Sequence, residues 1–264
     1  MSDAHAKAGR VEVRHCHGLA ELERCTEIER AVWGPEDCLP LPVFVVAEET
    51  GGQVLGAFLD GKMIGFTLGL PGFHTTKGEK LRPSIHSHMT AVLGEFRDRG
   101  VGRQLKLFQR KDALERGMNL VEWTFDPLEM RNAHFNLMRL GVIVRRFIPN
   151  CYGITPSPLH RGLPTDRLLA EWWLDSPRVT GLLEERSVPR PAANAKSILV
   201  PARMSDWLRS DRSRAAEEQA RIGKEFQRLF AEGYVATAIE NTQDGGYYLF
   251  EPYEHVKEEL DADS

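Results

Sequence analysis

Hydrophobic positions follow two periods along the first two thirds of the chain. Apolar runs at residues 53–59 and 63–70 flank Asp60-Gly61, which predicts a β-hairpin. Apolar residues recur at helical spacing after Val101, up to Gly117, where a helix is expected to end. The same reading predicts strands at 11–15, 53–59, 63–70, 85–92, 120–125, 142–148 and 168–174, and helices at 19–33, 42–50, 101–116 and 131–140. The polar segment 71–83 is expected to be a loop.

The pattern changes after Pro177. The segment 189–194 is rich in proline and alanine and predicts a linker or surface loop. A short strand, a long charged helix and a hairpin should follow, at 197–200, 213–232, 235–240 and 247–250. We therefore expect a core at 11–176 and a C-terminal α/β extension at 177–264. The extension should pack against the core, either extending its sheet or covering an open cleft.

The central segment, 84–117, reads as a strand, a glycine turn and a helix. Gly100 and Gly102 let the backbone turn with its N–H groups pointing outward, at the positive end of the helix dipole. Such a turn can bind phosphate. A Rossmann fingerprint would need glycine at Leu105, and a P-loop would need Lys and Ser or Thr at Arg103 and Gln104. Both of these nucleotide-binding motifs are therefore missing.

Three features together resemble the GNAT superfamily of CoA-dependent acyltransferases. The first is Arg97-x-x-Gly100-x-Gly102, which is similar to the pyrophosphate-binding turn of that family, and the second is the predicted element order β-α-α-β-β-β-α-β-α-β-β. The third is Asn132-Ala133 followed by Leu140-Gly141, similar to the family's later helix beside the CoA pantetheine. Segments 124–141 and 162–179 resemble one bacterial branch of predicted GNAT acetyltransferases. The resemblance implies an α/β (α+β) fold with a mixed, mostly antiparallel sheet flanked by helices.

The resemblance also implies a cosubstrate and its binding residues. Acetyl-CoA, or another acyl-CoA such as succinyl-CoA, would donate an acyl group to the amine of a small molecule such as an amino acid. The main chain at Thr90 and Val92 would hold the acyl carbonyl and the pantetheine. The residues implied for the rest of the CoA site are Arg97, Asp98, Arg99, Gly100, Val101, Gly102, Arg103 and Asn132.

Two histidines are the candidates for a general base. His86 and His88 alternate with Thr90 and Val92, so strand geometry predicts that all of them share one face. Imidazole, with an ordinary pKa near 6.5, is mostly neutral at pH 7 and can accept a proton. The alternative for either ring is a buried histidine hydrogen-bonded to the backbone.

The general acid is less well marked. Where many GNAT enzymes carry a tyrosine on the later helix, this chain has Leu137, and Tyr152 could replace it as the acid, although packing alone would also explain Tyr152. Two other functions stay open. One is a catalytically idle CoA-binding sensor or partner module. The other is a nucleotide-binding enzyme with Glu122 at the ribose, which the position of Glu122 inside a strand disfavours.

Composition restricts the remaining classes of protein. The formal net charge of -4 and pI of about 6.2 predict no general nucleic-acid binding, so basic groups must gather locally. The expected local cluster is Arg97, Arg99, Arg103, Lys106, Arg110 and Lys111, and Arg131, Arg145, Arg146 or Arg161 could hold an acceptor carboxylate. The four cysteines form no CxxC pair, which predicts neither a metal site nor a disulfide framework. Without a signal-like or membrane-spanning apolar run, we expect a cytoplasmic monomer or homodimer.

Overall fold

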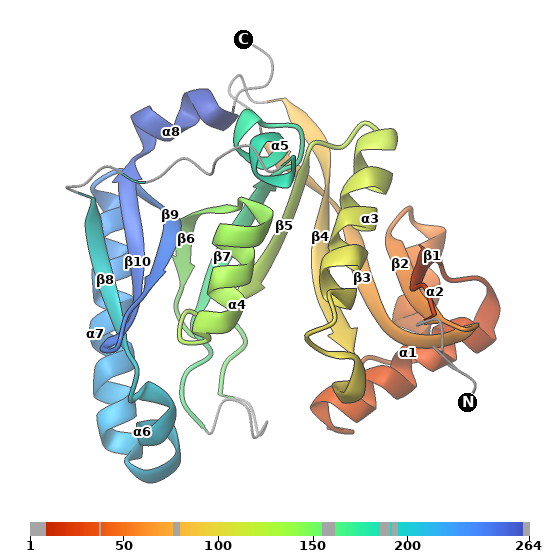
Figure 1. Cartoon of the computed structure of the whole chain (residues 1–264), viewed down its shortest axis with the longest axis horizontal. Helices are drawn as coiled ribbons and strands as arrows, with labels where there is room; N and C mark the ends of the chain where they lie inside the picture. Colours follow the sequence, from red (N-terminus) through yellow and green to blue (C-terminus); the bar gives the residue numbers. More distant parts are fainter. Residues whose placement is uncertain are drawn as a thin grey trace, which may run out of the picture. The chain divides into compact units, whose positions relative to one another are not determined.

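The computed structural model describes residues 9–36, 38–75, 80–154, 162–184, 191 and 195–260. By its internal contacts the chain forms two compact units, Met1–Met118 and Asn119–Ser264 (Figure 1). This division falls directly before the fifth strand, within the predicted 11–176 core. The boundary predicted at 176 stays a prediction, and each unit is described by itself below.

The first unit contains an antiparallel sheet in chain order. Its strands are β1 (Glu12–His15), β2 (Gln53–Leu59), β3 (Lys62–Thr75) and β4 (Leu81–Val92), each paired with the next. Asp60 and Gly61 both have positive φ, 49° and 77°, which is the geometry of a tight hairpin turn. This hairpin was predicted from Asp60-Gly61 and is confirmed.

The pairing of β3 with β4 corrects one expectation. Segment 71–83 was expected to be a loop, but the two strands continue pairing as far as Thr75 and Leu81. Pro71 and Pro83 are compatible with this outer part of the β3–β4 pair, called the arm below, because proline is tolerated where a strand N–H has no ladder bond to make. Phe73 and Leu81 on the arm are 72% and 68% exposed.

Different helices cover the two faces of this sheet. The helices are α1 (Gly18–Trp33), α2 (Leu41–Glu49) and α3 (Val101–Glu115), with the short 3-10 turn η1 (Gly94–Phe96) before α3. One core layer joins Leu22 of α1 and Phe44 of α2 to strand residues such as Phe66. The other joins Val101 and Leu105 of α3 to alternate strand residues. Because burying apolar area stabilises the fold, the layers fix α3 on one face and α1 and α2 on the other.

The second unit contains a larger antiparallel sheet. Its strands are β5 (Leu120–Phe125), β6 (Ile143–Ile148), β7 (Arg167–Trp173), β8 (Lys196–Pro201), β9 (Tyr234–Asn241) and β10 (Gly245–Pro252), in the spatial order β5-β7-β6-β9-β10-β8. Ala236 of β9 pairs with Val144 of β6. The strands of the predicted extension therefore continue the sheet that β5, β7 and β6 begin, which is one of the two arrangements expected for the extension.

Helices complete the second unit. They are α4 (Met130–His134), the π-helical segment η2 (Phe135–Leu140), α5 (Pro177–Leu183), α6 (Met204–Ser210), α7 (Arg212–Ala231) and α8 (Tyr253–Leu260). The long helix α7 packs on the sheet through Phe226, whose ring stacks on Phe147 with centroids 5.9 Å apart. Figure 1 shows this helix alongside β8, β9 and β10, the strands of the extension. The contact between Phe226 and Phe147 thus packs helix α7 of the extension on strand β6 of the same unit.

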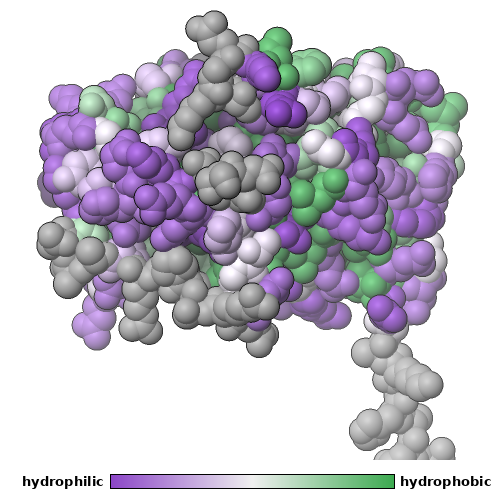
Figure 2. Space-filling view, turned by 90° about the horizontal axis from the view of Figure 1, so that it is seen from above, coloured by the Kyte–Doolittle hydropathy of each residue, from purple (hydrophilic) through white to green (hydrophobic). Residues whose placement is uncertain are grey.

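The surface of the molecule is mostly hydrophilic on the face drawn in Figure 2, with smaller hydrophobic patches between polar side chains. Among the described residues, no helix is long and apolar enough to cross a membrane. In that same part of the chain, no group of three or more His, Cys, Asp or Glu residues is arranged to hold a metal ion.

Candidate functional site

The glycine turn between β4 and α3 presents open backbone donors. Asp98 and Gly100 take left-handed φ values of 65° and 78°, and the first helical bond runs from the N–H of Gln104 to the carbonyl of Gly100. Within the described part of the chain, no hydrogen bond is made by the backbone N–H groups of Arg99, Gly100, Val101, Gly102 and Arg103. Alternating left- and right-handed residues gather such donors into an anion-binding concavity. The turn therefore presents a set of backbone donors that suits an anion, and its role as a phosphate site stays a prediction.

Packing inside the protein does not explain why glycine stands at position 102. A Cβ added there would meet no described atom within 4 Å, and its φ is not in the left-handed region. Helix propensity does not favour glycine either, since glycine in a helix interior costs roughly 1 kcal/mol relative to alanine. A residue without a side chain fits a backbone that something outside the chain approaches closely. Gly100 differs, because its positive φ favours glycine by itself.

The basic residues near the turn are less uniform than the sequence suggested. Arg97 donates from Nε to the carbonyl of Val92 at 3.1 Å, and the guanidinium of Arg99 lies 5.6 Å from the centroid of the Phe96 ring. Arg103 is exposed. Lys106 was expected in the same basic cluster, but it is buried, with only 5% of it exposed. Lys111 was also expected in this cluster, but it lies ten residues beyond the start of α3 and pairs with Glu115 at 3.7 Å, so it is not part of the turn. The local positive charge therefore comes from the arginines of the turn.

Lys106 lies between α3 and the sheet. Its Nζ is 2.7 Å from Ser87 Oγ on β4 and 3.1 Å from Gln109 Oε1 one helical turn on. Desolvation lowers its pKa to about 7, because burial penalises the charged form. The sequence predicted only that Lys106 belongs to the basic residues of the turn and its helix. Its polar partners explain why its burial is tolerated.

A β-bulge in β4 corrects the predicted alignment of the two histidines. Met89 pairs with Leu68 and Ser87 pairs with Gly69, so His88 is an extra residue without a partner in β3. A bulge of this kind interrupts the alternation of side chains. His86 and His88 therefore do not share one regular face with Thr90 and Val92.

The packing partners identify the faces on either side of the bulge. Ser87 contacts Lys106 of α3, and Val92 packs in the same layer as Val101. Met89 belongs to the α1 and α2 layer, as does Leu70, which pairs with His86. His86 thus points to the face opposite α3.

The two imidazoles are close neighbours in this arrangement. Their ring centroids are 6.2 Å apart with a tilt of 44°, and neither ring makes a hydrogen bond with any residue in the described ranges. Desolvation lowers the pKa of both, and the positive charges of His88 and Lys106 lower that of His86 further. Both rings are thus held in the neutral form that can accept a proton. Within the described ranges, neither ring makes the hydrogen bond to a backbone carbonyl that a purely structural histidine would need.

Thr90 and Val92 are both engaged by neighbours. Thr90 Oγ1 lies 3.0 Å from Thr67 Oγ1 across the β3–β4 pair, and the Val92 carbonyl accepts the bond from Arg97. Both histidines, Thr90 and Val92 lie on β4, and the predicted residues 97–103 lie in the turn and first helical residues that follow it.

The remaining predicted site residues belong to the second unit. The Tyr152 hydroxyl lies 2.7 Å from Thr124 Oγ1, and its ring faces the Arg167 guanidinium at 5.4 Å. Asn132 is exposed on α4. Leu137, in the position where the resemblance would place a tyrosine acid, is fully buried in η2.

An ion pair in the second unit alters the expectation for Arg145. Arg145 donates to the Glu171 carboxylate from Nε at 3.0 Å and from Nη2 at 2.5 Å. Its guanidinium fork is thus occupied, which speaks against its holding an acceptor carboxylate.

Glu122 lies opposite Glu171 in the β5–β7 pair. Desolvation raises the pKa of Glu122, and the negative charge of Glu171 raises it further. Sequence reasoning missed this cluster because its members are far apart in the chain. Arg146 is exposed, and Arg161 lies outside the described residues.

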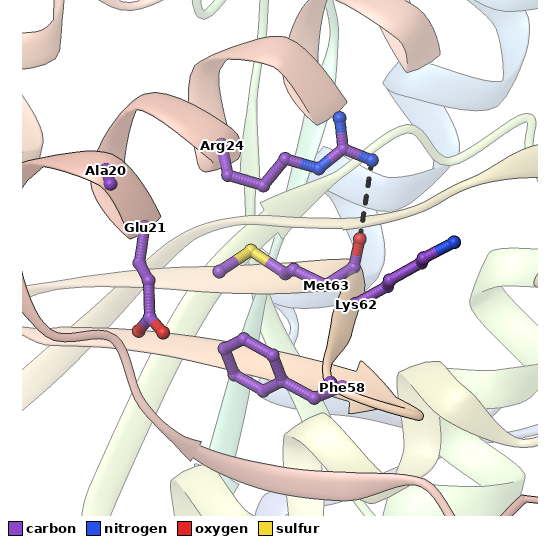
Figure 3. Close-up of a pocket in the computed structure, with 7 residues that line it drawn as sticks. Ala20, Glu21, Arg24, Phe58, Lys62 and Met63 are labelled. Carbon is purple, nitrogen blue, oxygen red and sulfur yellow. Dashed lines mark hydrogen bonds between the residues drawn. The ribbon is translucent and has the colours of Figure 1, made fainter.

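An open pocket lies between α1 and the β2–β3 hairpin (Figure 3). Its volume is about 370 Å³, and its lining is Ala20, Glu21, Arg24, Phe58, Gly61, Lys62 and Met63. Arg24 donates to the carbonyl of Met63 at 3.4 Å. Arg14 holds the Glu21 carboxylate and lowers its pKa to about 2. None of the predicted site residues lines this pocket.

Comparison with known proteins identifies the fold. No protein-family model matches the chain, and no curated protein matches it in sequence. Among solved structures, a proposed acetyltransferase from Acinetobacter baylyi ADP1 is 15% identical, with a TM-score of 0.50, over 65% of this chain and 96% of that one. A ribosomal-protein-alanine N-acetyltransferase from Brucella melitensis is 18% identical, with a TM-score of 0.48, over 61% and 98% of the two chains. The likeness to the Acinetobacter structure shows that the chain shares its fold, a mixed α/β fold with a largely antiparallel sheet flanked by helices, which is the fold that the resemblance implied.

Proposed function

We propose that this protein is an acyl-CoA-dependent N-acyltransferase. The observation that carries the proposal is the row of open N–H groups at residues 99–103, at the start of α3 in a GNAT fold. Those donors and the arginines beside them suit the pyrophosphate of CoA. Acetyl-CoA is the proposed donor, with succinyl-CoA as the second choice.

The proposed reaction is a direct transfer. The acceptor ammonium loses a proton, and the resulting amine attacks the thioester carbonyl to form a tetrahedral oxyanion. Collapse of the oxyanion forms the amide and breaks the carbon–sulfur bond. The departing CoA sulfur takes up a proton from the acid, and the second proton of the attacking nitrogen is lost to solvent, which restores the proton balance. His86 or His88 takes the first proton, since both imidazoles are neutral near pH 7. Main-chain groups near Thr90 would polarise the carbonyl.

The proposed acid for the departing thiolate is Tyr152. Leu137 has no proton to donate, whereas Tyr152 is half-exposed and its hydroxyl is hydrogen-bonded to Thr124. A thiolate is a stable leaving group, so this role is expected to affect the rate less than the base does.

We also propose a small-molecule amine as the acceptor, because the chain is mildly acidic overall. The competing function is a CoA-binding sensor without activity. Two neutral imidazoles without hydrogen-bond partners in the described structure favour the enzyme, because a pure binding module has no use for bases there.

The test is an assay of free thiol release. The purified protein is incubated with acetyl-CoA or succinyl-CoA and a panel of amines, amino acids and a histone-like peptide. Amine-dependent thiol release with at least one free amine supports the proposal. Binding of acyl-CoA without release for any amine or peptide would favour the sensor, and efficient acylation of the peptide alone would overturn the small-molecule acceptor.

A further inference from the structure

The β4 bulge is held by polar contacts from the α3 side. Ser87, directly before the extra residue His88, bonds Lys106 Nζ at 2.7 Å. Thr90, two residues after His88, bonds Thr67 of β3. The bulge is thus restrained on both sides, while His86 points to the opposite face of the sheet. An irregular strand position needs such restraints, because a bulge lacks the ladder bonds that fix a regular pair.

Lys106 belongs to a continuous polar network beneath the sheet. Gln109 accepts from Lys106 and donates to Gln53 of β2 at 3.0 Å. Gln53 donates to Asp112 Oδ2 at 2.7 Å, and Asp112 Oδ1 lies 2.8 Å from Nε2 of His15 on β1. Although burial raises the pKa of Asp112, hydrogen bonds from His15, Gln53 and Arg116 lower it below its usual range. The network therefore ties the amino group of Lys106 to fixed partners on three strands.

A purely stabilising role does not explain why a lysine is buried at position 106. Removing a buried lysine from water is costly, and apolar residues of similar size are commonly at least as stabilising. A methionine at this position could fill the same buried space on α3 without that cost. A buried amine that contacts the bulge is better explained by what the bulge carries.

We propose that Lys106 is a positioning residue for acyl transfer: it holds the Ser87 hydroxyl and thereby fixes the bulge that presents His86 and His88. This inference rests on the proposed function. Lys106 acts through the strand and touches neither acceptor nor acyl-CoA. Because an ångström of misplacement at a reacting group can cost about 10²-fold in rate, a fixed bulge matters for turnover.

The same geometry has an electrostatic consequence. Desolvation is the largest cause of the lowered pKa of His86, and the charges of His88 and then Lys106 lower it further. When His86 titrates, below its ordinary pKa of 6.5, Lys106 with a pKa of about 7 is mostly protonated. Removing the amine should therefore raise the pKa of His86. Removing only the Ser87 hydroxyl should leave that charge in place.

The test compares Lys106→Met, Ser87→Ala and the control Lys111→Met. Lys111 lies on the same helix, but its side chain is 67% exposed and pairs with Glu115 at 3.7 Å. Histidine pKa values are measured by NMR titration of the full-length protein without ligand, and kcat and the KM for acyl-CoA are measured against pH.

In Lys106→Met the His86 pKa should rise, and kcat should fall about tenfold or more with KM for acyl-CoA within about twofold. Ser87→Ala should lose kcat similarly while His86 keeps its low pKa. Lys111→Met should match wild type in both.

Absence of the selective kcat loss in Ser87→Ala, or of the pKa rise in a folded Lys106→Met, overturns the proposal. A kcat loss accompanied by an equal rise in KM indicates general unpacking and also overturns it. If Lys106→Met does not fold, Ser87→Ala decides. If wild type transfers no acyl group to any amine, the proposed function fails and this role fails with it, while the NMR titration still reports whether Lys106 acts on His86.

Discussion

The glycine turn of the first unit and the Arg145–Glu171 pair of the second use similar groups in opposite ways. Glu171 is buried, and its carboxylate is matched by Arg145 and also accepts from Trp173 Nε1 at 3.2 Å. In the turn, donors at residues 99–103 have no partner among the residues described. A polar group satisfied inside the fold contributes to stability, whereas one left open is available to a ligand. Substitutions in the two regions should therefore change different measured quantities.

The largest effect is expected at the histidines beside the bulge. His86→Ala or His88→Ala, whichever removes the true base, should lower kcat by about 10²- to 10⁴-fold with little change in acyl-CoA affinity. Desolvation lowers the pKa of both rings below 6.5, so the wild-type rate should fall only as pH drops through that lower value and protonates the base. The measurement is kcat against pH. Near wild-type turnover and an unchanged acidic limb in both variants would mean that neither ring is the base.

The paired region should respond in stability instead. Glu171→Leu removes the partner of Arg145 and should lower the free energy of unfolding by about 1 to 3 kcal/mol, measured by urea denaturation. Acyl-CoA affinity should stay the same. The matched double variant with Arg145→Met should recover part of the loss, because no charge is then left without its partner. A large affinity loss with unchanged stability would reverse the contrast between the two regions.

The turn should respond in affinity without a loss of stability. Gly102→Val adds a side chain where the protein itself has open space, so the fold should tolerate it. Acyl-CoA affinity should fall by more than about tenfold, or 1.4 kcal/mol. Gly181→Val is the control, since Gly181 also lies in a helix with nothing within 4 Å of an added Cβ. Equal affinity in Gly102→Val, Gly181→Val and wild type would remove the phosphate site from the turn.

The smallest effect is expected at a more exposed ion pair. Arg14 lowers the pKa of Glu21 from 4.5 to about 2 through a 2.6 Å contact. Because the folded pKa is depressed, the stabilisation is present above the unfolded value near 4.5 and is lost as pH falls toward 2. Glu21→Gln should therefore be less stable than wild type by under about 1 kcal/mol at pH 6. Denaturation at several pH values should show the difference shrinking toward pH 2, and a difference that grows there would contradict this account.

Local patterns made much of the fold predictable. The Asp60-Gly61 hairpin and the strand, glycine turn and helix around Gly100 depend on residues adjacent in sequence, and both were predicted at the right positions. The helix predicted at 213–232 is α7, Arg212–Ala231. The short helices α5, α6 and α8 were not predicted, because so few turns give little periodic signal.

The candidate site was harder to predict for a physical reason. Strand alternation placed His86 and His88 with Thr90, but the bulge is set by pairing with Leu68 and Gly69, which the β4 sequence alone does not encode. Lys106 was grouped with the basic residues of the turn and its helix because the strand residue that it contacts, Ser87, is distant in the chain. Glu171 and Arg145 were missed as a pair for the same reason.

The most direct test of the central claim is an amide NMR titration of the protein with acetyl-CoA. The account predicts saturable shifts of the N–H signals of residues 99–103, because these open donors would bond the pyrophosphate. The shifts should be lost in Gly102→Val and kept in Gly181→Val. Saturable binding that leaves the signals of residues 99–103 unmoved, or no binding at all, would contradict the assignment of the turn as the acyl-CoA site.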